Sequence, residues 1–161
     1  MINEINNLEQ QTISDIAWLA GFWDADGHIS IVKRRTYLVP VCACTNTNKT
    51  LIDNVMRILD AAEIPYLLEY QDRGERKNAR PAWSVKMESR PRVQAFLKLI
   101  RNQLVGKQEQ ADLVMKWCDL PKAASIGGGR GVGSVGVRYA DGYWEIKDEL
   151  STLNSRGRVR D

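Results

Sequence analysis

Cysteine and long apolar runs are scarce in this sequence. Its 161 residues include three cysteines, and an odd number argues against a disulfide framework and for a reducing compartment. No apolar run reaches the roughly 20 residues that span a bilayer. The first residues, MINEINNLEQQT, are polar and acidic and do not resemble a signal or transit peptide. We therefore expect an intracellular protein of the cytoplasm, nucleoid or organelle matrix, neither secreted nor bound to a membrane.

Basic residues are absent from the start of the chain. Residues 1–32 hold five acids and no Lys or Arg, whereas the remainder holds 23 bases and 15 acids. The bases gather in KRR, in RGERKNAR and in the tail SRGRVR. An acidic pole against a basic remainder suggests a polyanionic partner around a metal-binding centre. A solvated surface with a loose tail is the alternative.

Composition otherwise fits one globular domain spanning 1–161, since 43% of residues are hydrophobic and 27% charged. Residues 125–136, SIGGGRGVGSVG, are expected to form a flexible Gly-rich loop. This loop lacks the Lys-Ser/Thr pair of a P-loop, which argues against a nucleotide site. Residues 155–161 form the basic tail.

Hydrophobic periodicity predicts an α+β fold in the order α-β-β-α-β-β-α-α-α. Ser14 is a plausible N-cap for a helix that ends near Ala25. Strands are predicted at 28–34, 37–45, 66–73 and 82–89, and further helices at 49–62, 91–102, 107–118 and 142–153. Strands joined as hairpins indicate an antiparallel sheet with helices on one face. Pro40 indicates an edge position or an irregularity in the second strand.

The uncovered face of this sheet is expected to carry polar and basic side chains. A twisted basic sheet suits the major groove of DNA, although a solvated face would contain the same residues. The predicted base-reading residues are His28, Ser30, Arg34, Tyr37, Gln71, Arg73, Ser84 and Lys86. The predicted phosphate contacts are Arg76, Lys77 and Arg130.

Small residues line one side of the opening helix. Ala17, Gly21 and Ala25 follow an i, i+4, i+8 spacing, which permits close approach of another helix backbone. The predicted partner is the same helix of a second copy across a two-fold axis. Close packing within one chain is the alternative.

Asp26 would then face its own copy at the negative end of a helix. That arrangement is costly unless divalent cations lie between the two carboxylates. The Asp26 carboxylate and the backbone carbonyl of Ala25 are hard oxygen ligands that suit Mg²⁺. An acid that caps a neighbouring loop is the alternative.

The segment LAGFWDADG, Leu19 to Gly27, closely resembles the LAGLIDADG motif of homing endonucleases and departs from it at Phe22 and Trp23. Two later segments also resemble that family: NQLVGKQEQADLVMK, which contains Lys107, and YWEIKDELSTLNSRG. The resemblance covers about residues 12–157. One copy of the motif resembles the homodimeric, intron-encoded branch.

The resemblance implies an α-β-β-α-β-β-α core with a four-stranded antiparallel saddle sheet, plus C-terminal helices. It also implies a site-specific endonuclease that binds a long pseudo-palindromic DNA duplex and cuts both strands with short 3′ overhangs. Mg²⁺ is the expected cofactor, with Mn²⁺ as a substitute and Ca²⁺ supporting binding without cleavage. The alternatives are an RNA maturase that acts on its host intron RNA and an inactive DNA-binding protein of the same fold.

The resemblance assigns functions to individual residues. Asp26 and the Ala25 carbonyl are the expected metal ligands, and Lys107 the basic residue that stabilises charge at the phosphate. Asp24 is expected to be structural and to lie at the dimer interface with Ala17, Gly21 and Ala25. Asn46 is expected to order the catalytic water, with Asn48 as the alternative. Lys49 is a weaker basic candidate, and His28 a groove or metal-adjacent contact.

Overall fold

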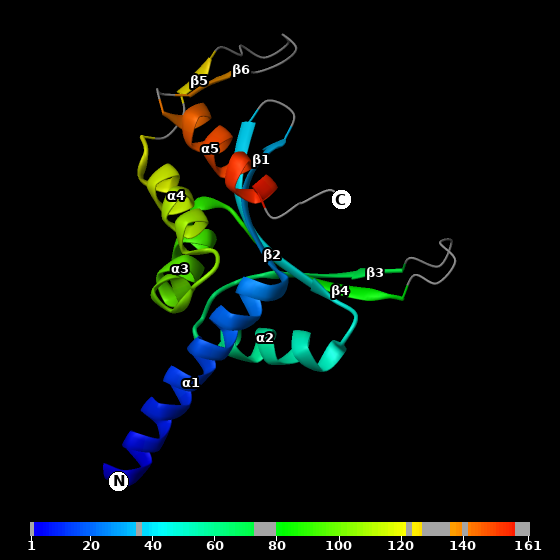
Figure 1. The fold of residues 1–161 in the computed structure, drawn as a ribbon, viewed down its shortest axis with the longest axis vertical. Coiled ribbons are helices and arrows are strands. Elements are labelled where there is room, and N and C mark those ends of the chain that lie inside the picture. Colours follow the sequence, from blue (N-terminus) through cyan, green and yellow to red (C-terminus); the bar gives the residue numbers. More distant parts are fainter. Residues whose placement is uncertain are drawn as a thin grey trace.

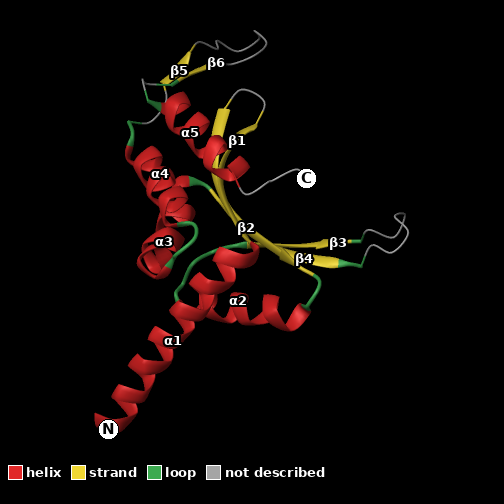
Figure 2. Ribbon diagram, in the orientation of Figure 1, coloured by secondary structure: helices red, strands yellow, loops and turns green. Residues whose placement is uncertain are grey.

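The computed structural model describes residues 2–34, 37–72, 80–121, 124–126, 136–139 and 142–156 (Figures 1 and 2). Its helices are α1 (Ile2–Asp26), α2 (Lys49–Ala61), α3 (Arg90–Ile100), α4 (Gln108–Asp119) and α5 (Tyr143–Arg156), with a 3-10 turn, η1 (Arg101–Gln103), between α3 and α4. Its strands are β1 (Gly27–Arg34), β2 (Tyr37–Asn46), β3 (Leu67–Gln71), β4 (Ala82–Glu88), β5 (Ala124–Ile126) and β6 (Gly136–Arg138). None of the helices described is long and apolar enough to cross a membrane.

A bent antiparallel sheet organises the molecule. Its strand order is β1-β2-β4-β3, and every neighbouring pair is antiparallel. Figure 1 shows β1 and β2 rising on one side of the bend and β3 and β4 extending on the other, with α1 to α4 around the convex side. The α+β fold with a four-stranded antiparallel sheet, predicted from the sequence, is confirmed.

Strand register divides the side chains between two faces. The convex face carries apolar residues such as Ile29, Cys42, Val85 and Met87, all buried against the helices. Their partners on α1 include Trp23. The centroid of its ring lies 4.4 Å from the ring centroid of Phe96 on α3. Burial of this apolar surface is the main stabilising contribution to the fold. The concave face carries most of the polar side chains of the sheet, together with Val32, Val39, Val41 and Leu67.

Three details differ from the sequence-based expectations. The first helix does not begin after Ser14 but runs from Ile2, because residues 2–13 contain no Gly or Pro to stop it. β2 is a central strand rather than an edge strand, but its pairing with β4 begins only at Val41, so Pro40 itself lies at a locally unpaired edge, as its presence indicated. The ends of the segment expected to be a Gly-rich loop pair with each other as β5 and β6, and residues 127–135 lie outside the described residues.

Gly27 joins α1 directly to β1. A Cβ atom at this position would lie 2.4 Å from the Cγ and Cδ1 atoms of Trp23 and 2.5 Å from the Trp23 carbonyl oxygen. The backbone of β1 therefore lies against the last turn of α1 with no room for a side chain. This contact sets the angle at which the helix enters the sheet.

Replacing Gly27 with Ala should lower the free energy of unfolding by about 3 kcal/mol, because neither the buried Trp23 ring nor the backbone carbonyl can yield easily. Urea unfolding followed by circular dichroism would measure the change. The control is Gly106→Ala, whose new methyl would lie at an ordinary 3.5 Å from Asp24 Oδ1. Equal stability of Gly27→Ala and the wild type would contradict this account of the junction.

Candidate active site

The C-terminus of α1 is held by a turn from a distant part of the chain. The Asp24 carboxylate accepts hydrogen bonds from the backbone N–H groups of Val105, at 2.7 Å, and Lys107, at 2.9 Å. These two donors come from the connection between η1 and α4, so Asp24 fastens the start of α4 to the end of α1. Asp24 therefore makes structural contacts within its own chain.

Lys107 caps the same helix end with its side chain. Its Nζ donates to the carbonyl oxygens of Trp23, at 2.9 Å, and of Asp24. A cation at this position offsets the partial negative charge of the helix end. Partial burial lowers the pKa of Lys107, and the charges of Asp24 and Asp26 oppose that shift. An ammonium has three N–H donors, so two bonds to carbonyls leave one for solvent or a phosphate oxygen.

Asp26 and Asn46 lie together at the exposed end of the helix. Asn46 Nδ2, at the end of β2, donates to Asp26 Oδ2 at 2.7 Å. Asn46 Oδ1 in turn accepts from the backbone N–H of Asn48 at 2.7 Å, which fixes the orientation of the amide. The Asn48 side chain caps α2 by accepting from the N–H of Thr50. Of the two asparagines considered, Asn46 is therefore the one that contacts the carboxylate.

The fold and these contacts agree with a match to a known protein family. A family model described as a LAGLIDADG-like domain matches residues 14–101, more than half of the chain. The chain belongs to the LAGLIDADG family. The match includes the C-terminal half of α1, with the motif at its end, and the whole four-stranded sheet.

Solved structures of LAGLIDADG proteins share this fold. The homing endonuclease I-CvuI, in complex with the I-CreI target and Mg, aligns with a TM-score of 0.63 and 19% identity over 94% of this chain and 88% of that chain. I-CvuI with its own target and Ca aligns with a TM-score of 0.54 and 23% identity, over 67% and 68% of the two chains. The meganuclease I-CpaMI bound to uncleaved DNA aligns with a TM-score of 0.52 and 18% identity. That alignment covers 65% of this chain and 35% of the I-CpaMI chain. At these identities the likeness establishes the fold.

A sequence relative comes from Methanocaldococcus jannaschii. This uncharacterized protein is 37% identical over 65 residues, which is 40% of the present chain. The alignment spans only 24% of that relative's own length.

The small residues of the LAGLIDADG helix are exposed. Ala17, Gly21 and Ala25 all lie at the surface, and a Cβ atom on Gly21 would meet nothing within 4 Å. Ile13, one turn before Ala17, is 63% exposed. The alternative explanation, close packing of this stripe within one chain, is therefore wrong. The stripe is a surface on which another helix could pack.

The oxygen donors at the helix end fit a hard divalent cation in type but are few. Asp26 offers an exposed carboxylate, and the Ala25 carbonyl lies in the last turn beside it. Among the residues that the structure describes, no three His, Cys, Asp or Glu side chains are grouped to hold a metal ion. A cation here would need additional ligands from water, from a substrate or from a second copy of the chain.

Strand register places the described base-reading candidates on one face. His28, Ser30 and Arg34 share the concave face of β1. Ala43 connects His28 to Lys86 across the sheet, and Ser84 lies two residues before Lys86 on the same face of β4. Tyr37, opposite Arg34, and Gln71, opposite Ala82, lie on the same face. The structure therefore places all seven candidates on the concave face, spread along its length. Arg73, Arg76, Lys77 and Arg130 lie outside the described residues.

Two of these candidates are not exposed as expected. Ser30 is 7% exposed and Ser84 is 5% exposed, and Thr45 Oγ1 donates to Ser84 Oγ at 3.0 Å. Both serines lie in the interior of the bent sheet, where larger neighbours shield short side chains. In this conformation the two serines form the floor of the concave face, and their side chains are too buried to contact a bound duplex.

Two acidic residues on the concave face were missed by the sequence analysis. Glu88 pairs with Arg34 at 2.5 Å, and Glu69 pairs with Lys86 at 3.0 Å. Each acid lies two positions from a predicted base-reading residue on its own strand. Glu88 follows Lys86 on β4, and Glu69 precedes Gln71 on β3. Strict application of the two-residue period of a strand would have found them. Lys49, the weaker basic candidate, pairs with Asp53 on its own helix.

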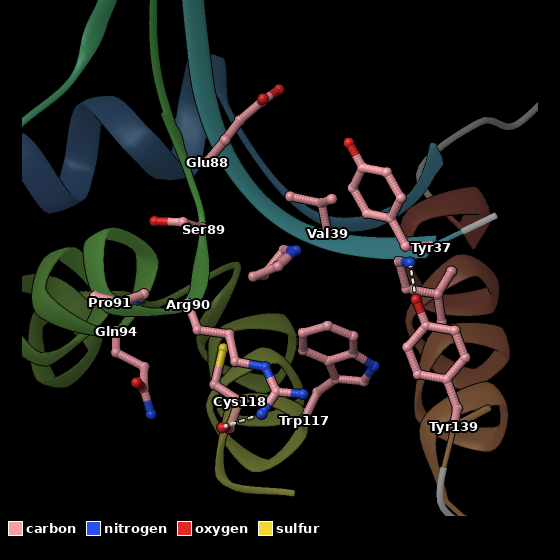
Figure 3. A pocket seen from close by; sticks show the side chains of 12 residues that line it. Tyr37, Val39, Glu88, Ser89, Arg90, Pro91, Gln94, Trp117, Cys118 and Tyr139 are labelled. Atoms are coloured by element: carbon pink, nitrogen blue, oxygen red, sulfur yellow. Dashed lines mark hydrogen bonds between the residues drawn. The ribbon is translucent and has the colours of Figure 1, made fainter. Parts of the chain in front are cut away.

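A groove of about 740 Å³ lies on the other side of β2, between the strands and helices α3 and α4 (Figure 3). Arg90, at the centre of the groove, makes structural contacts. Its guanidinium donates to the carbonyl of Leu120 at 2.8 Å, and its Cζ atom lies 4.8 Å from the centroid of the Trp117 ring. Burial raises the pKa of the neighbouring Cys118 thiol to about 12, which keeps it protonated. Figure 3 shows Glu88 directed away from this groove.

The two acids of the motif should differ in their effect on stability. Asp24→Asn loses one of two charge-assisted acceptors and should lower the free energy of unfolding by about 2 kcal/mol. Asp26→Asn, at an exposed site, should change it by less than about 0.5 kcal/mol. Urea unfolding of both variants under identical conditions would test this. Equal losses would contradict the structural assignment of Asp24.

Proposed function

We propose that this LAGLIDADG protein is a site-specific DNA endonuclease that acts as a homodimer and requires a divalent cation. The observation that carries the proposal is the grouping at the end of α1, where an exposed Asp26 lies beside Asn46 and one turn from the Lys107 ammonium. Carboxylate, amide and ammonium groups are the components that phosphodiester hydrolysis needs around a metal. The DNA-bound fold relatives support double-stranded DNA as the substrate.

Each side chain would have a separate task in the reaction. Asp26 and the Ala25 carbonyl would hold Mg²⁺, or Mn²⁺ in its place, and such an ion activates water and neutralises phosphate charge. Asn46 would keep the Asp26 carboxylate in one orientation and order solvent beside it. Lys107, already fixed to the helix end, would stabilise the charge that develops on the phosphate.

A second copy would complete the site. Packing of the exposed Ala17-Gly21-Ala25 stripe against its own copy would bring two Asp26 carboxylates together near a two-fold axis. Each copy would cut one strand, and the two concave sheets would bind the two halves of a long, roughly palindromic site. Cuts on either side of that axis, across the minor groove, would leave short 3′ overhangs.

Asp26→Asn should reduce cleavage by more than about 10²-fold, because the amide is a poor metal ligand. Binding of the duplex in Ca²⁺ should remain close to wild type, since phosphate and base contacts carry the affinity. The wild type would first select its site from a random duplex library in Mg²⁺. Asp112→Asn, which removes an exposed acid paired with Arg101 on the helical layer, is the matched control. Cleavage by Asp26→Asn at the wild-type rate would refute the assignment, and selective binding by a wild type that never cuts would indicate an inactive DNA-binding protein.

Gly21→Leu should separate the two copies. A bulky side chain in a closely packed helix seam should weaken association by about 1–3 kcal/mol, or roughly 5- to 150-fold. Sedimentation equilibrium over a concentration series would measure the change. Ala95→Leu, which enlarges an exposed residue of α3, is the control. A dimer of unchanged affinity in Gly21→Leu would show that the stripe is not the interface.

A further inference from the structure

Four charged side chains form a connected cluster on the concave face of the sheet. Arg34 from β1 pairs with Glu88 from β4, and Lys86 from β4 lies 3.6 Å from the same Glu88 and 3.0 Å from Glu69 on β3. We call these four residues the concave charge cluster. It contains two acids and two bases and therefore carries no net charge.

The cluster lies among the residues expected to face DNA. Glu88 is opposite Val41, which is opposite Ser30 on β1, and Lys86 is opposite Ala43, which is opposite His28. The side chains beneath are short, so the cluster stands above the floor of the face. Lys86 is the most enclosed member, at 19% side-chain exposure, with Glu88 at 26%. A duplex on this face would meet the cluster directly.

Phosphate binding does not account for this arrangement. Affinity for the DNA backbone comes from cations that displace condensed counterions, and a carboxylate beside each cation opposes that contribution. Fold stability does not account for it either, because partly exposed ion pairs contribute little. The two glutamates would therefore weaken non-specific binding to DNA, with only a modest contribution to stability from their ion pairs.

Base recognition does account for the cluster. In the major groove, guanine presents two acceptors that suit Arg or Lys, and cytosine presents an amino donor that suits a carboxylate. An adjacent cation and carboxylate thus match the two edges of a G·C pair. The carboxylates also restrict Arg34 and Lys86 to a few conformations, which reduces the entropy lost when these side chains contact a base.

We propose that Glu69 and Glu88 are specificity determinants, which hold Lys86 and Arg34 for contacts with base edges and oppose binding through phosphates alone. This proposal rests on the proposed function, because it requires that the concave face bind duplex DNA. It assigns to two acids a function in a protein whose partner is a polyanion.

The test compares the wild type with Glu69→Gln and Glu88→Gln, which keep the shape of each side chain and remove its charge. Binding to a selected site and to an unrelated duplex is measured in Ca²⁺ across a range of salt concentrations, and each variant also selects its own sites from a random library. Asp112→Asn, which breaks the Arg101 ion pair away from the sheet, is the control. Thermal unfolding checks that all variants are folded.

Each glutamine variant should bind the unrelated duplex more tightly at low salt, with the slope of log K against log salt steeper by about one. The ratio of specific to non-specific affinity should fall at least about fivefold, and the selected sites should lose a G·C preference at one position in each half. Unchanged slopes and unchanged selected sites, with a selective wild type, would overturn this proposal alone. A wild type without any sequence preference on duplex DNA would overturn the proposed function as well.

Discussion

The C-terminus of α1 is the point on which the rest of the structure depends. Two carboxylates, Asp24 and Asp26, stand where the helix already carries partial negative charge, and the chain offsets this with groups from more than eighty residues away. Backbone N–H groups satisfy Asp24, and the Lys107 ammonium binds the last-turn carbonyls. This contact fixes α4 relative to α1 and holds a cation next to Asp26, so one electrostatic constraint serves both the fold and the candidate active site.

A second constraint links that site to the sheet. Because Gly27 leaves no room for a side chain against Trp23, β1 begins without any intervening loop. The concave face therefore starts within two residues of Asp26, and His28 is its first outward residue. The carboxylate proposed for catalysis and the surface proposed for DNA contacts are thus held at a constant spacing by backbone packing. Asn46, at the far end of β2, reinforces this spacing by binding Asp26 from the neighbouring strand.

Local patterns predicted most of the elements, and tertiary contacts decided what those patterns left open. Alternation along the strands identified the concave face, because side-chain direction follows from the two-residue period alone. The burial of Ser30 and Ser84 depends on how strongly the sheet bends, and the ion pairs of Glu69 and Glu88 depend on register between strands far apart in the sequence. The choice between Asn46 and Asn48 likewise required the position of β2 relative to α1. Ser14 was misread as a cap because a good cap residue can also lie inside a longer helix.

The exposed stripe of α1 and the small number of oxygen donors at its end would have one explanation in common. A helix that presents Ala17, Gly21 and Ala25 at its surface gains little from them, since small side chains bury little apolar area within their own chain. Close approach of a second backbone is what such residues permit. Asp26 lies at the end of that stripe, and in the described part of one chain the acidic, histidine and cysteine side chains do not group in threes around it. We infer that one event, association through α1, supplies both the missing packing partner and the second carboxylate, so that metal binding, dimer formation and the ability to cut both strands would depend on one another.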